Sequence, residues 1–351
     1  MRSSPRWPDF VSESLTRDTS LVRPLLSADT AGLRQSTSMR VVVFGATGVV
    51  GRRAVRLMIR QGHRVTAVGR SPERLQNLAS QGASTVALDL LDRDAIKRAV
   101  GDHEAIVNLA TAIPRSTLAM FFPSAWKEND RIREHVSASI VDEALAAGVR
   151  VYIQESFAPI YVDAGDRWIT EDAATQPVRY NQTTLKAEAS AGRFARQGGR
   201  GVVLRFAYFY GPDDRFTGDM FQYVARGWLP LLGSSDAYFS TCDHDDAATA
   251  VVTALNLGSG IYNVVDNEPM THRQFGEVLA AIVGAPMPKT PPQWLVPLTG
   301  SVGETMARSL RISNAKLRQM GGWAPQHATS REGWAAVCRS SMFERTGSLR
   351  R

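Results

Sequence analysis

The sequence predicts a doubly wound α/β fold, with helices on both faces of a parallel sheet and a small C-terminal lobe on the substrate side. Short apolar runs alternate with longer segments of helical spacing, and a glycine-rich turn follows the first apolar run. These two observations predict the sheet. The regular alternation ends after Gly211-Pro212, and this change predicts the smaller lobe.

The elements of the sheet follow in order from residue 39. Each predicted strand is a short apolar run, and each predicted helix has apolar residues three or four positions apart. Because every crossover helix must bury its apolar stripe on the sheet, the strands are expected to run parallel. In chain order the predicted strands are 39–44, 63–68, 85–88, 105–109, 150–154, 201–206 and 260–265, and the predicted helices are 50–61, 72–80, 93–100, 125–147, 183–197 and 247–255.

These segments predict how the chain is divided. Within the lobe, Thr271-His272-Arg273-Gln274 has the form of a capping box at a helix start, and the Pro-rich stretch 286–297 interrupts regular structure. Both ends of the chain are polar and lack a helical or strand period. The predicted parts are a flexible N-terminal extension (1–38), a nucleotide-binding domain of the Rossmann type (39–212 with 240–266), a substrate-side lobe (213–239 with 267–336) and a basic tail (337–351).

Charge and composition exclude several classes of protein. The 351 residues include 41 Lys and Arg against 34 Asp and Glu, a net charge of +7. Residues 306–351 hold nine basic and two acidic residues and so carry the whole surplus, which leaves the α/β part near neutral. We therefore expect no nucleic-acid partner. No apolar run is long enough to span a membrane, and Cys242 and Cys338 lie far apart, so a cytoplasmic protein is expected.

The run Asp243-His244-Asp245-Asp246 contains residue types that bind metals. Adjacent side chains cannot all point inward from one short segment, however. We expect Asp245 or Asp246 to cap the helix that follows, and we expect no metal site.

The turn after the first strand carries the strongest motif, a G-x-x-G-x-x-G run between a strand and a helix. Gly45 permits the tight turn, Gly48 lets the backbone approach a pyrophosphate, and Gly51 lets the helix pack close to the strand. The amides at the helix N-terminus favour phosphate charge. The run therefore predicts a dinucleotide site. Its residues are Gly45, Thr47, Gly48, Val49, Val50 and Gly51.

The second strand indicates which dinucleotide binds. An acidic residue at its end would bind the ribose 2′-hydroxyl of NAD, but this strand is followed by Gly69-Arg70-Ser71. The guanidinium of Arg70, with or without help from Arg52, suits a 2′-phosphate. NADP(H) is therefore expected in preference to NAD(H), which stays an alternative. Three further residues follow the third and fourth strands, at the sheet edge where such folds bind ligands: Asp89, Leu90 and Ala110.

Beyond the glycine run, Asp89-Leu90, Asn129 in the long fourth helix and the segments 151–156 and 204–212 form a familiar pattern. The last of these is similar to L-R-x-x-x-x-Y-G-P. With them the chain resembles the short-chain dehydrogenase/reductase superfamily, in its extended and atypical branch of NAD-dependent epimerase/dehydratase-like proteins. The resemblance covers about residues 39–334. It implies a Rossmann fold, a nicotinamide cofactor with Asn129 among its binding residues, and a catalytic group of serine, tyrosine and lysine.

The catalytic group that the resemblance implies is incomplete here. Ser156 falls at the family's serine position and Tyr180 at its tyrosine position, but Thr184 stands where the lysine should be. Lys186 lies on another face of the helix than a residue four positions after Tyr180. An alternative register puts Lys186 at the lysine position, but Gln182 then stands at the tyrosine position. Without an ammonium group nearby, the Tyr180 phenol should keep its ordinary pKa of about 10 and act poorly as a base.

Two classes of function stay open. The first is an NAD(P)-dependent oxidoreductase or epimerase/dehydratase-like enzyme for a small carbonyl, imine or alcohol, with Tyr180 as acid or with Glu155 or Tyr161 carrying the proton. The second is a non-catalytic NADP(H)-binding regulatory protein. The apolar loop 113–126 either lines the substrate pocket, covers the core or forms the subunit contact of a homodimer.

Overall fold

The structure is a computed structural model that describes residues 38–114 and 119–348, with side chains as far as Arg339. The extension predicted for residues 1–38 lies outside the described residues, apart from Ser38. In the described part of the chain, no helix combines the length and the hydropathy that crossing a membrane requires.

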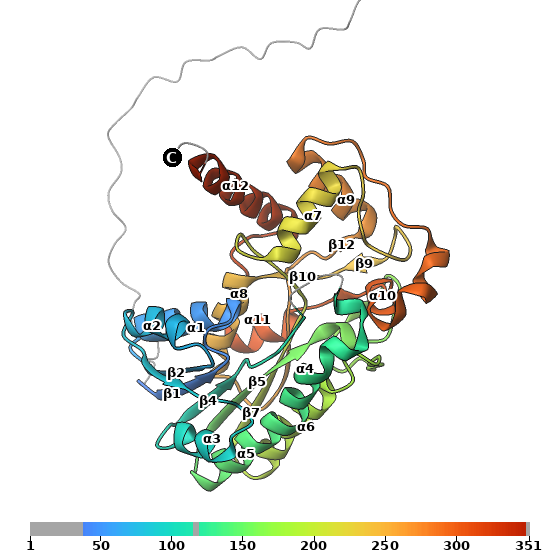
Figure 1. The fold of residues 1–351 in the computed structure, drawn as a ribbon. Coiled ribbons are helices and arrows are strands. Elements are labelled where there is room, and N and C mark those ends of the chain that lie inside the picture. Colours follow the sequence, from blue (N-terminus) through green and yellow to red (C-terminus); the bar gives the residue numbers. More distant parts are fainter. Residues whose placement is uncertain (1–37, 115–118, 349–351) are drawn as a thin grey trace, which may run out of the picture. The chain divides into compact units, whose positions relative to one another are not determined.

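Seven parallel strands form the central sheet. They are β1 (Arg40–Phe44), β2 (Arg64–Gly69), β3 (Ser84–Ala87), β4 (Ala105–Asn108), β5 (Val151–Phe157), β7 (Arg200–Phe206) and β11 (Gly260–Val264). Their order across the sheet is β3-β2-β1-β4-β5-β7-β11, so the direction of winding reverses between β1 and β4 (Figure 1). Val41 of β1 pairs with Val65 on one side and Ala105 on the other. The predicted doubly wound fold is therefore confirmed.

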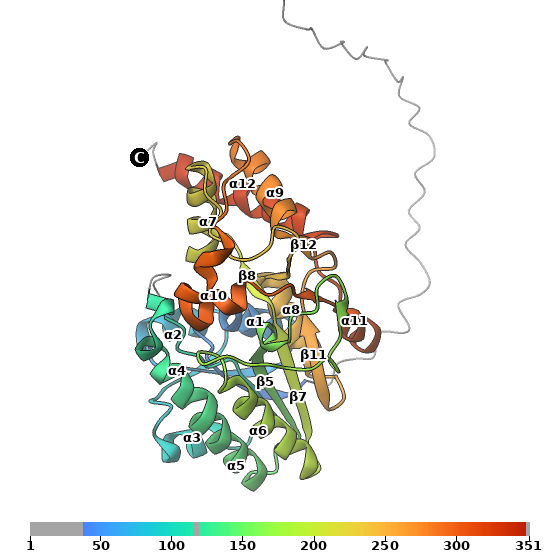
Figure 2. The same ribbon diagram turned by 90° about the vertical axis from the view of Figure 1, so that its right-hand side faces the viewer.

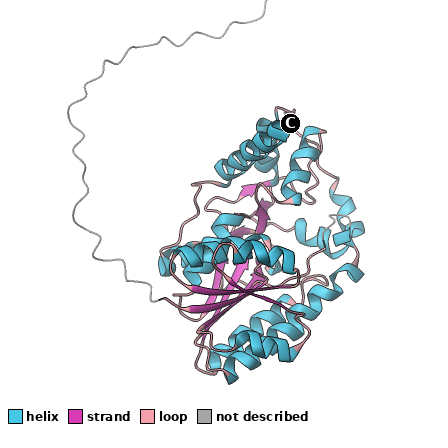
Figure 3. Cartoon of the chain, turned by 60° about the vertical axis from the view of Figure 1, so that its left-hand side comes forward, coloured by secondary structure: helices cyan, strands magenta, loops and turns pink. Residues whose placement is uncertain are grey.

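Helices cover both faces of the sheet (Figure 3). Val41 and Val43 of β1 pack under one layer of helices, whereas Val42 and Phe44 pack under the other, because alternate residues of a strand point to opposite faces. β1 therefore contributes to the core on both faces of the sheet. The first layer is α1 (Val49–Arg60), α2 (Pro72–Ala79) and α8 (His244–Ala254), and the second is α3 (Arg93–Val100), α5 (Ser137–Ala146) and α6 (Thr184–Arg196).

The start of α8 differs from the prediction. Asp243 caps this helix, with its carboxylate accepting a hydrogen bond from the backbone N–H of Asp245 at 2.7 Å. The expectation that Asp245 or Asp246 would be the cap is therefore wrong. Asp246 instead accepts from the N–H of Gln326 at 2.8 Å and ties α8 to the C-terminal region.

The long helix predicted for 125–147 contains a turn of π-helix. The segments η2 (Pro123–Trp126), α4 (Lys127–Arg131), η3 (Ile132–Val136) and α5 follow one another without a break, and η3 is the π turn. Such turns occur often at functional sites. Arg133 lies in this turn and is buried against β5. β5 itself continues past its predicted end at Gln154 to Phe157, because its last residues still pair with β7, and Glu155 and Ser156 have buried polar partners.

The smaller lobe, whose helices lie above the sheet in Figure 2, has its own core. The ring of Trp334 lies 4.9 Å from that of Phe275 and 4.7 Å from that of Tyr210. The predicted capping box of Thr271 and Gln274 is present. The smaller lobe contains α7 (Arg215–Ala225), β9 (Tyr238–Phe239), β12 (Met270–Thr271), α9 (His272–Val283), η5 (Gln293–Thr299), α10 (Gly300–Met306) and α12 (Ser330–Ser348). The strands β8 (Tyr208–Tyr210) and β10 (Thr241–Asp243) pair with each other, and α11 (Ala315–Gly321) packs on β11 of the parallel sheet.

The stretch predicted as a basic tail, 337–351, begins inside α12. The backbone is helical through Ser348, and the side chains of Val337 and Cys338 are buried. The tail prediction is thus wrong for these first residues. It failed because their apolar contacts come from elements distant in the sequence.

Candidate active site

A cavity of about 670 Å³ opens at the carboxyl ends of β1, β2 and β4, where the winding of the sheet reverses. Phe209 and Phe216 close it from the side of the smaller lobe, and His244 of α8 also lines it. The position is the one at which open α/β sheets bind their ligands. The predicted cofactor residues on its wall are Gly45, Thr47, Gly48, Val49, Arg70, Asp89, Leu90 and Ala110.

The geometry of the glycine turn requires glycine. Gly45 has a φ of +76°, and a Cβ there would lie 2.6 Å from the carbonyl carbon of Leu109. A Cβ on Gly51 would collide with the carbonyl oxygen of Gly45. Gly48 is the N-cap of α1, and no side chain caps the helix, so its first amides are left for a ligand. Val50 is buried behind the turn. This cradle fits a pyrophosphate.

Arginines surround the end of the cavity beside β2. Arg70 forms an ion pair with Glu128 of α4, and both side chains are exposed. Arg74 of α2 lines the same cavity, and its guanidinium has no ion pair within the part of the chain that the structure describes. Burial, followed by the positive charges of neighbouring arginines that include Arg74, lowers the pKa of Arg52. Arg52 itself forms an ion pair with Asp213 and does not line this cavity, so of the arginines considered for a 2′-phosphate the structure places Arg70 on the wall and Arg52 away from it. Sequence reasoning missed Arg74, although it stands only four residues after Arg70.

Asp89 and Asn129 shape the loops around the cavity. The Asp89 carboxylate accepts from the N–H of Leu91 at 3.0 Å and closes a turn. Asn129 is fully buried behind the wall, where its Oδ1 accepts from the N–H of Ala112 at 3.0 Å. Its Nδ2 has no hydrogen-bond partner among the residues that the structure describes. Asn129 therefore supports the loop after β4, and it also holds an unsatisfied donor.

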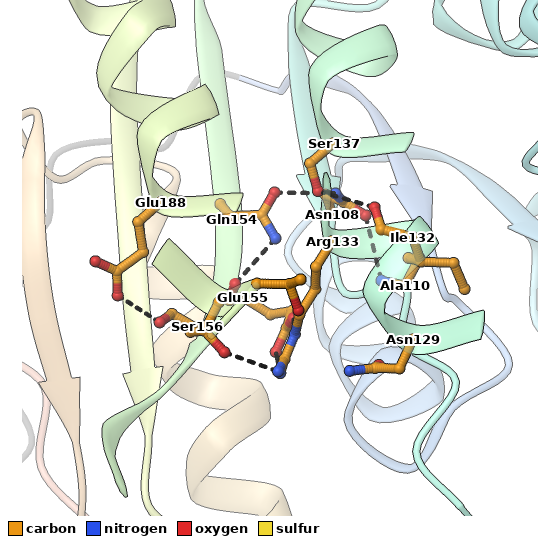
Figure 4. Close-up of polar contacts among 12 residues, drawn as sticks. Asn108, Ala110, Asn129, Ile132, Arg133, Ser137, Gln154, Glu155, Ser156 and Glu188 are labelled. Carbon is orange, nitrogen blue, oxygen red and sulfur yellow. Dashed lines mark hydrogen bonds and ion pairs between the residues drawn. The ribbon is translucent and has the colours of Figure 1, made fainter. Parts of the chain in front are cut away.

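The hydroxyl of Ser156 points toward the carboxylate of Glu188 (Figure 4), which forms a buried ion pair with Arg205. It donates to Glu188 Oε1 at 2.5 Å, and Glu188 accepts two hydrogen bonds from Arg205, each of 2.7 Å. Ser156 is 1% exposed and lines neither cavity described here. The structure therefore does not bring Ser156 and Tyr180 together on one cavity wall.

Arg133 occupies the surroundings of Thr184, which replaces the expected lysine. Its Nη1 donates to Thr184 Oγ1 at 2.8 Å, and its Nε and Nη2 donate to the Glu155 carboxylate at 3.1 and 3.3 Å. All three side chains are buried. A positive charge is thus present near this position, but it comes from the π turn rather than from α6. Lys186 is exposed. Arg133 is one of several charged residues between Lys127 and His135, so nothing in the sequence singles it out.

Tyr180 lines a second cavity, of about 350 Å³. Met120 belongs to the walls of both cavities, so the two are neighbours. Burial raises the pKa of Tyr180 to about 12, although a contact with Thr305 and the charge of Arg133 act to lower it. The phenol is therefore a neutral hydrogen-bond donor near pH 7.

His244 is a buried imidazole on the wall of the first cavity that the sequence assigned only to a capping run. It is 1% exposed, and neither ring nitrogen makes a hydrogen bond within the described residues. Burial lowers its pKa to about 4, so the ring is neutral at pH 7. The carboxylate of Asp213 lies 3.6 Å from Nδ1 of the ring. Asp213 also forms an ion pair of 2.9 Å with Arg53, which joins α1 to the loop before α7.

The remaining predicted residues lie elsewhere. The Tyr161 hydroxyl donates to Asn263 Oδ1 at 2.8 Å, away from both cavities, and burial raises the pKa of Tyr161 to about 12. In the loop 113–126, Ile113 lines the first cavity and Phe121 the second, so its described part does line the site. Residues 115–118 of this loop lie outside the described residues.

Comparison with known proteins supplies a family. Residues 41–264 match the model of the NAD dependent epimerase/dehydratase family. A "3-diazoavenalumate denitrifying reductase" of a Streptomyces species is 32% identical over 306 residues, which cover 84% of this chain and 99% of that relative. A "2-alkyl-3-oxoalkanoate reductase" of Stenotrophomonas maltophilia (strain K279a) is 24% identical over 276 residues, covering 71% of this chain and 77% of that relative.

Among solved structures, the dTDP-glucose 4,6-dehydratase DesIV of Streptomyces venezuelae, with NAD and TYD bound, superposes with a TM-score of 0.71. It is 19% identical, and the match covers 88% of this chain and 98% of DesIV. At 19% identity, this structural similarity is evidence for the fold alone. The family match spans most of the parallel sheet and the glycine turn. The match to the relative at 32% identity covers most of this chain and nearly all of that relative. The chain therefore belongs to the NAD-dependent epimerase/dehydratase family.

Proposed function

We propose that the chain is an NADP(H)-dependent reductase of a small electrophilic carbonyl, imine or diazo compound. The observation that carries the proposal is the pairing of a complete dinucleotide cradle with a tyrosine that has no lysine partner. The cradle is formed by Gly45, Gly48 and Gly51 at the mouth of the first cavity. Tyr180 lies on the adjoining cavity, and its phenol is held neutral.

Several residues of the chain would hold the cofactor. The uncapped amides at the start of α1 would bind the pyrophosphate, and the guanidinium groups of Arg70 and Arg74 would bind a 2′-phosphate. A 2′-phosphate would compete with Glu128 for Arg70. The reducing equivalent would be the hydride that a bound nicotinamide supplies.

The raised pKa of Tyr180 favours reduction over oxidation. Oxidation of an alcohol needs a base that removes the hydroxyl proton, and a phenol with a pKa of about 12 is a poor base at neutral pH. As a neutral group, Tyr180 can donate a hydrogen bond to a substrate oxygen or nitrogen. Acceptors that need no proton at all should therefore suit this site best.

The names of two relatives support this direction, since both are reductases. The relative that is 32% identical is named for a diazo compound and for denitrification. Hydride and an arenediazonium ion combine to give the arene and dinitrogen, so that reaction balances without a proton. The absence of the family's lysine would then not slow this reaction.

The test is a panel of acceptors with NADPH deuterated at C4: benzaldehyde, a cyclic iminium salt and an arenediazonium salt. We expect loss of the reduced-nicotinamide absorbance together with deuterium in the product. Replacing Tyr180 with phenylalanine should slow benzaldehyde reduction by at least about tenfold and leave diazonium reduction unchanged. The proposal fails if no acceptor class consumes NADPH, or if the variant slows all classes equally.

A second candidate is a protein that binds NADP(H) without turnover. It is favoured by the hydroxyl of Ser156, which is engaged with Glu188 and does not face either cavity. This candidate predicts NADPH affinity with no deuterium transfer to any member of the panel.

A further inference from the structure

The second cavity has a fixed aromatic interior. The ring centroids of Trp126 and Tyr180 lie 4.8 Å apart, and Met120 and Phe121 complete the apolar wall. The indole N–H of Trp126 donates to the carbonyl oxygen of Met120 at 2.8 Å and so holds the ring in place. Flat apolar groups pack well against such walls. A volume of about 350 Å³ is near the lower limit of ligand pockets, which suits a compact molecule.

Two cations stand at the mouth of this cavity. Lys127 and Arg179 both line it and are both exposed. Neither side chain forms an ion pair with any residue that the structure describes. The carboxylate of Asp130, also on the wall, accepts a hydrogen bond from the Thr183 hydroxyl at 2.7 Å. Two cations and one carboxylate thus give the mouth of the cavity a net positive charge, and the interior below it is apolar.

We propose that this cavity binds the substrate as a planar, apolar carboxylate. The carboxylate would sit between Lys127 and Arg179, and the flat body would lie against Trp126 with its far end toward Met120. Since Met120 also lines the first cavity, that end is the part of the substrate nearest to the dinucleotide cradle. The inference rests on the proposed function, because it names the substrate class for the same site.

The choice of a carboxylate follows from the pattern of charge. A neutral ligand would leave two unpaired cations beside it, and a cationic ligand would be repelled. A carboxylate accepts charge-assisted hydrogen bonds from both the ammonium and the guanidinium. The aromatic wall then favours planar acids over flexible aliphatic ones, because flat groups pack well against the rings of Trp126 and Tyr180.

The experiment uses cinnamate as the probe and methyl cinnamate as its uncharged match. Binding to the full chain is measured by titration calorimetry. We expect cinnamate to bind at least about tenfold more tightly than the ester, and Lys127→Met or Arg179→Met each to remove most of that difference. Lys97→Met, an exposed cation on α3, is the control and should change nothing. All three positions are exposed, so far-ultraviolet circular dichroism should show unchanged folding.

The proposal is overturned if the ester and cinnamate bind equally, if neither binds at millimolar concentration, or if both mouth variants keep the affinity for cinnamate. A parallel titration with NADPH separates this result from the proposed function. Intact NADPH binding without cinnamate binding rejects the carboxylate site alone. Cinnamate binding without any NADPH-dependent reduction of the acceptor panel keeps the carboxylate site and rejects the reductase.

Discussion

Replacing Thr184 with lysine would restore the family's Tyr-x-x-x-Lys spacing, yet the structure predicts a damaged protein. Arg133 Nη1 lies 2.8 Å from Thr184 Oγ1, so the new ammonium would be buried beside a guanidinium. Two like charges about 4 Å apart, at an effective dielectric constant of about 20, repel by about 4 kcal/mol. Glu155 already pairs with Arg133 and can offset only part of this cost.

The assay is urea unfolding followed by far-ultraviolet circular dichroism. Thr184→Lys should lower the free energy of unfolding by about 2–4 kcal/mol, whereas Thr184→Ser, which keeps the hydroxyl acceptor, should lose less than about 1 kcal/mol. Adding Arg133→Met to Thr184→Lys should recover much of the loss, because Glu155 can then pair with the introduced lysine. The reasoning is refuted if Thr184→Lys alone is as stable as the parent chain, or if Arg133→Met makes it less stable still.

Three further predictions concern other parts of the molecule. Gly51→Ala should abolish nucleotide binding, because its Cβ would collide with a backbone oxygen, whereas Gly218→Ala, with open space in helix α7, should keep binding and fold at least as stably; calorimetry and urea unfolding check both. Burial raises the pKa of Asp266 to about 7 from an ordinary 3.8, so the parent chain should lose stability as the pH rises between these two values. Asp266→Asn should therefore be more stable than the parent chain at alkaline pH, but not below pH 3.8. Melting temperatures measured across this pH range check both statements. Ser156→Ala removes one hydrogen bond to Glu188 and should cost about 1 kcal/mol of stability while leaving NADPH oxidation rates within about threefold, and a loss of about a hundredfold would instead make this serine catalytic.

The strands, the helices and the glycine turn could be predicted because their signals are local. A β-branched run such as Val41–Phe44 and a glycine at Gly45 carry the same meaning wherever the rest of the chain lies. The assignment of Tyr180 and Ser156 to the family's tyrosine and serine positions stays a prediction. Their surroundings could not be predicted.

Contacts made across the fold determine what those side chains do. Glu188 lies far along the chain from Ser156 and captures its hydroxyl, and Arg133 reaches Thr184 from a different helix through a π turn that no residue pattern signals. His244 was read as one member of a charged run, yet burial makes it a neutral wall residue. Each of these depends on tertiary packing rather than on spacing.

The central claim is that the first cavity is a dinucleotide site selective for NADP(H). Titration calorimetry of the full chain with NADPH and NADH tests it most directly, together with the double variant Arg70→Ala/Arg74→Ala. We predict one site per chain, NADPH affinity at least about tenfold above that for NADH, and loss of this preference in the variant with little change for NADH. Absence of binding by either nucleotide, or equal affinities that the variant leaves unchanged, would contradict the claim.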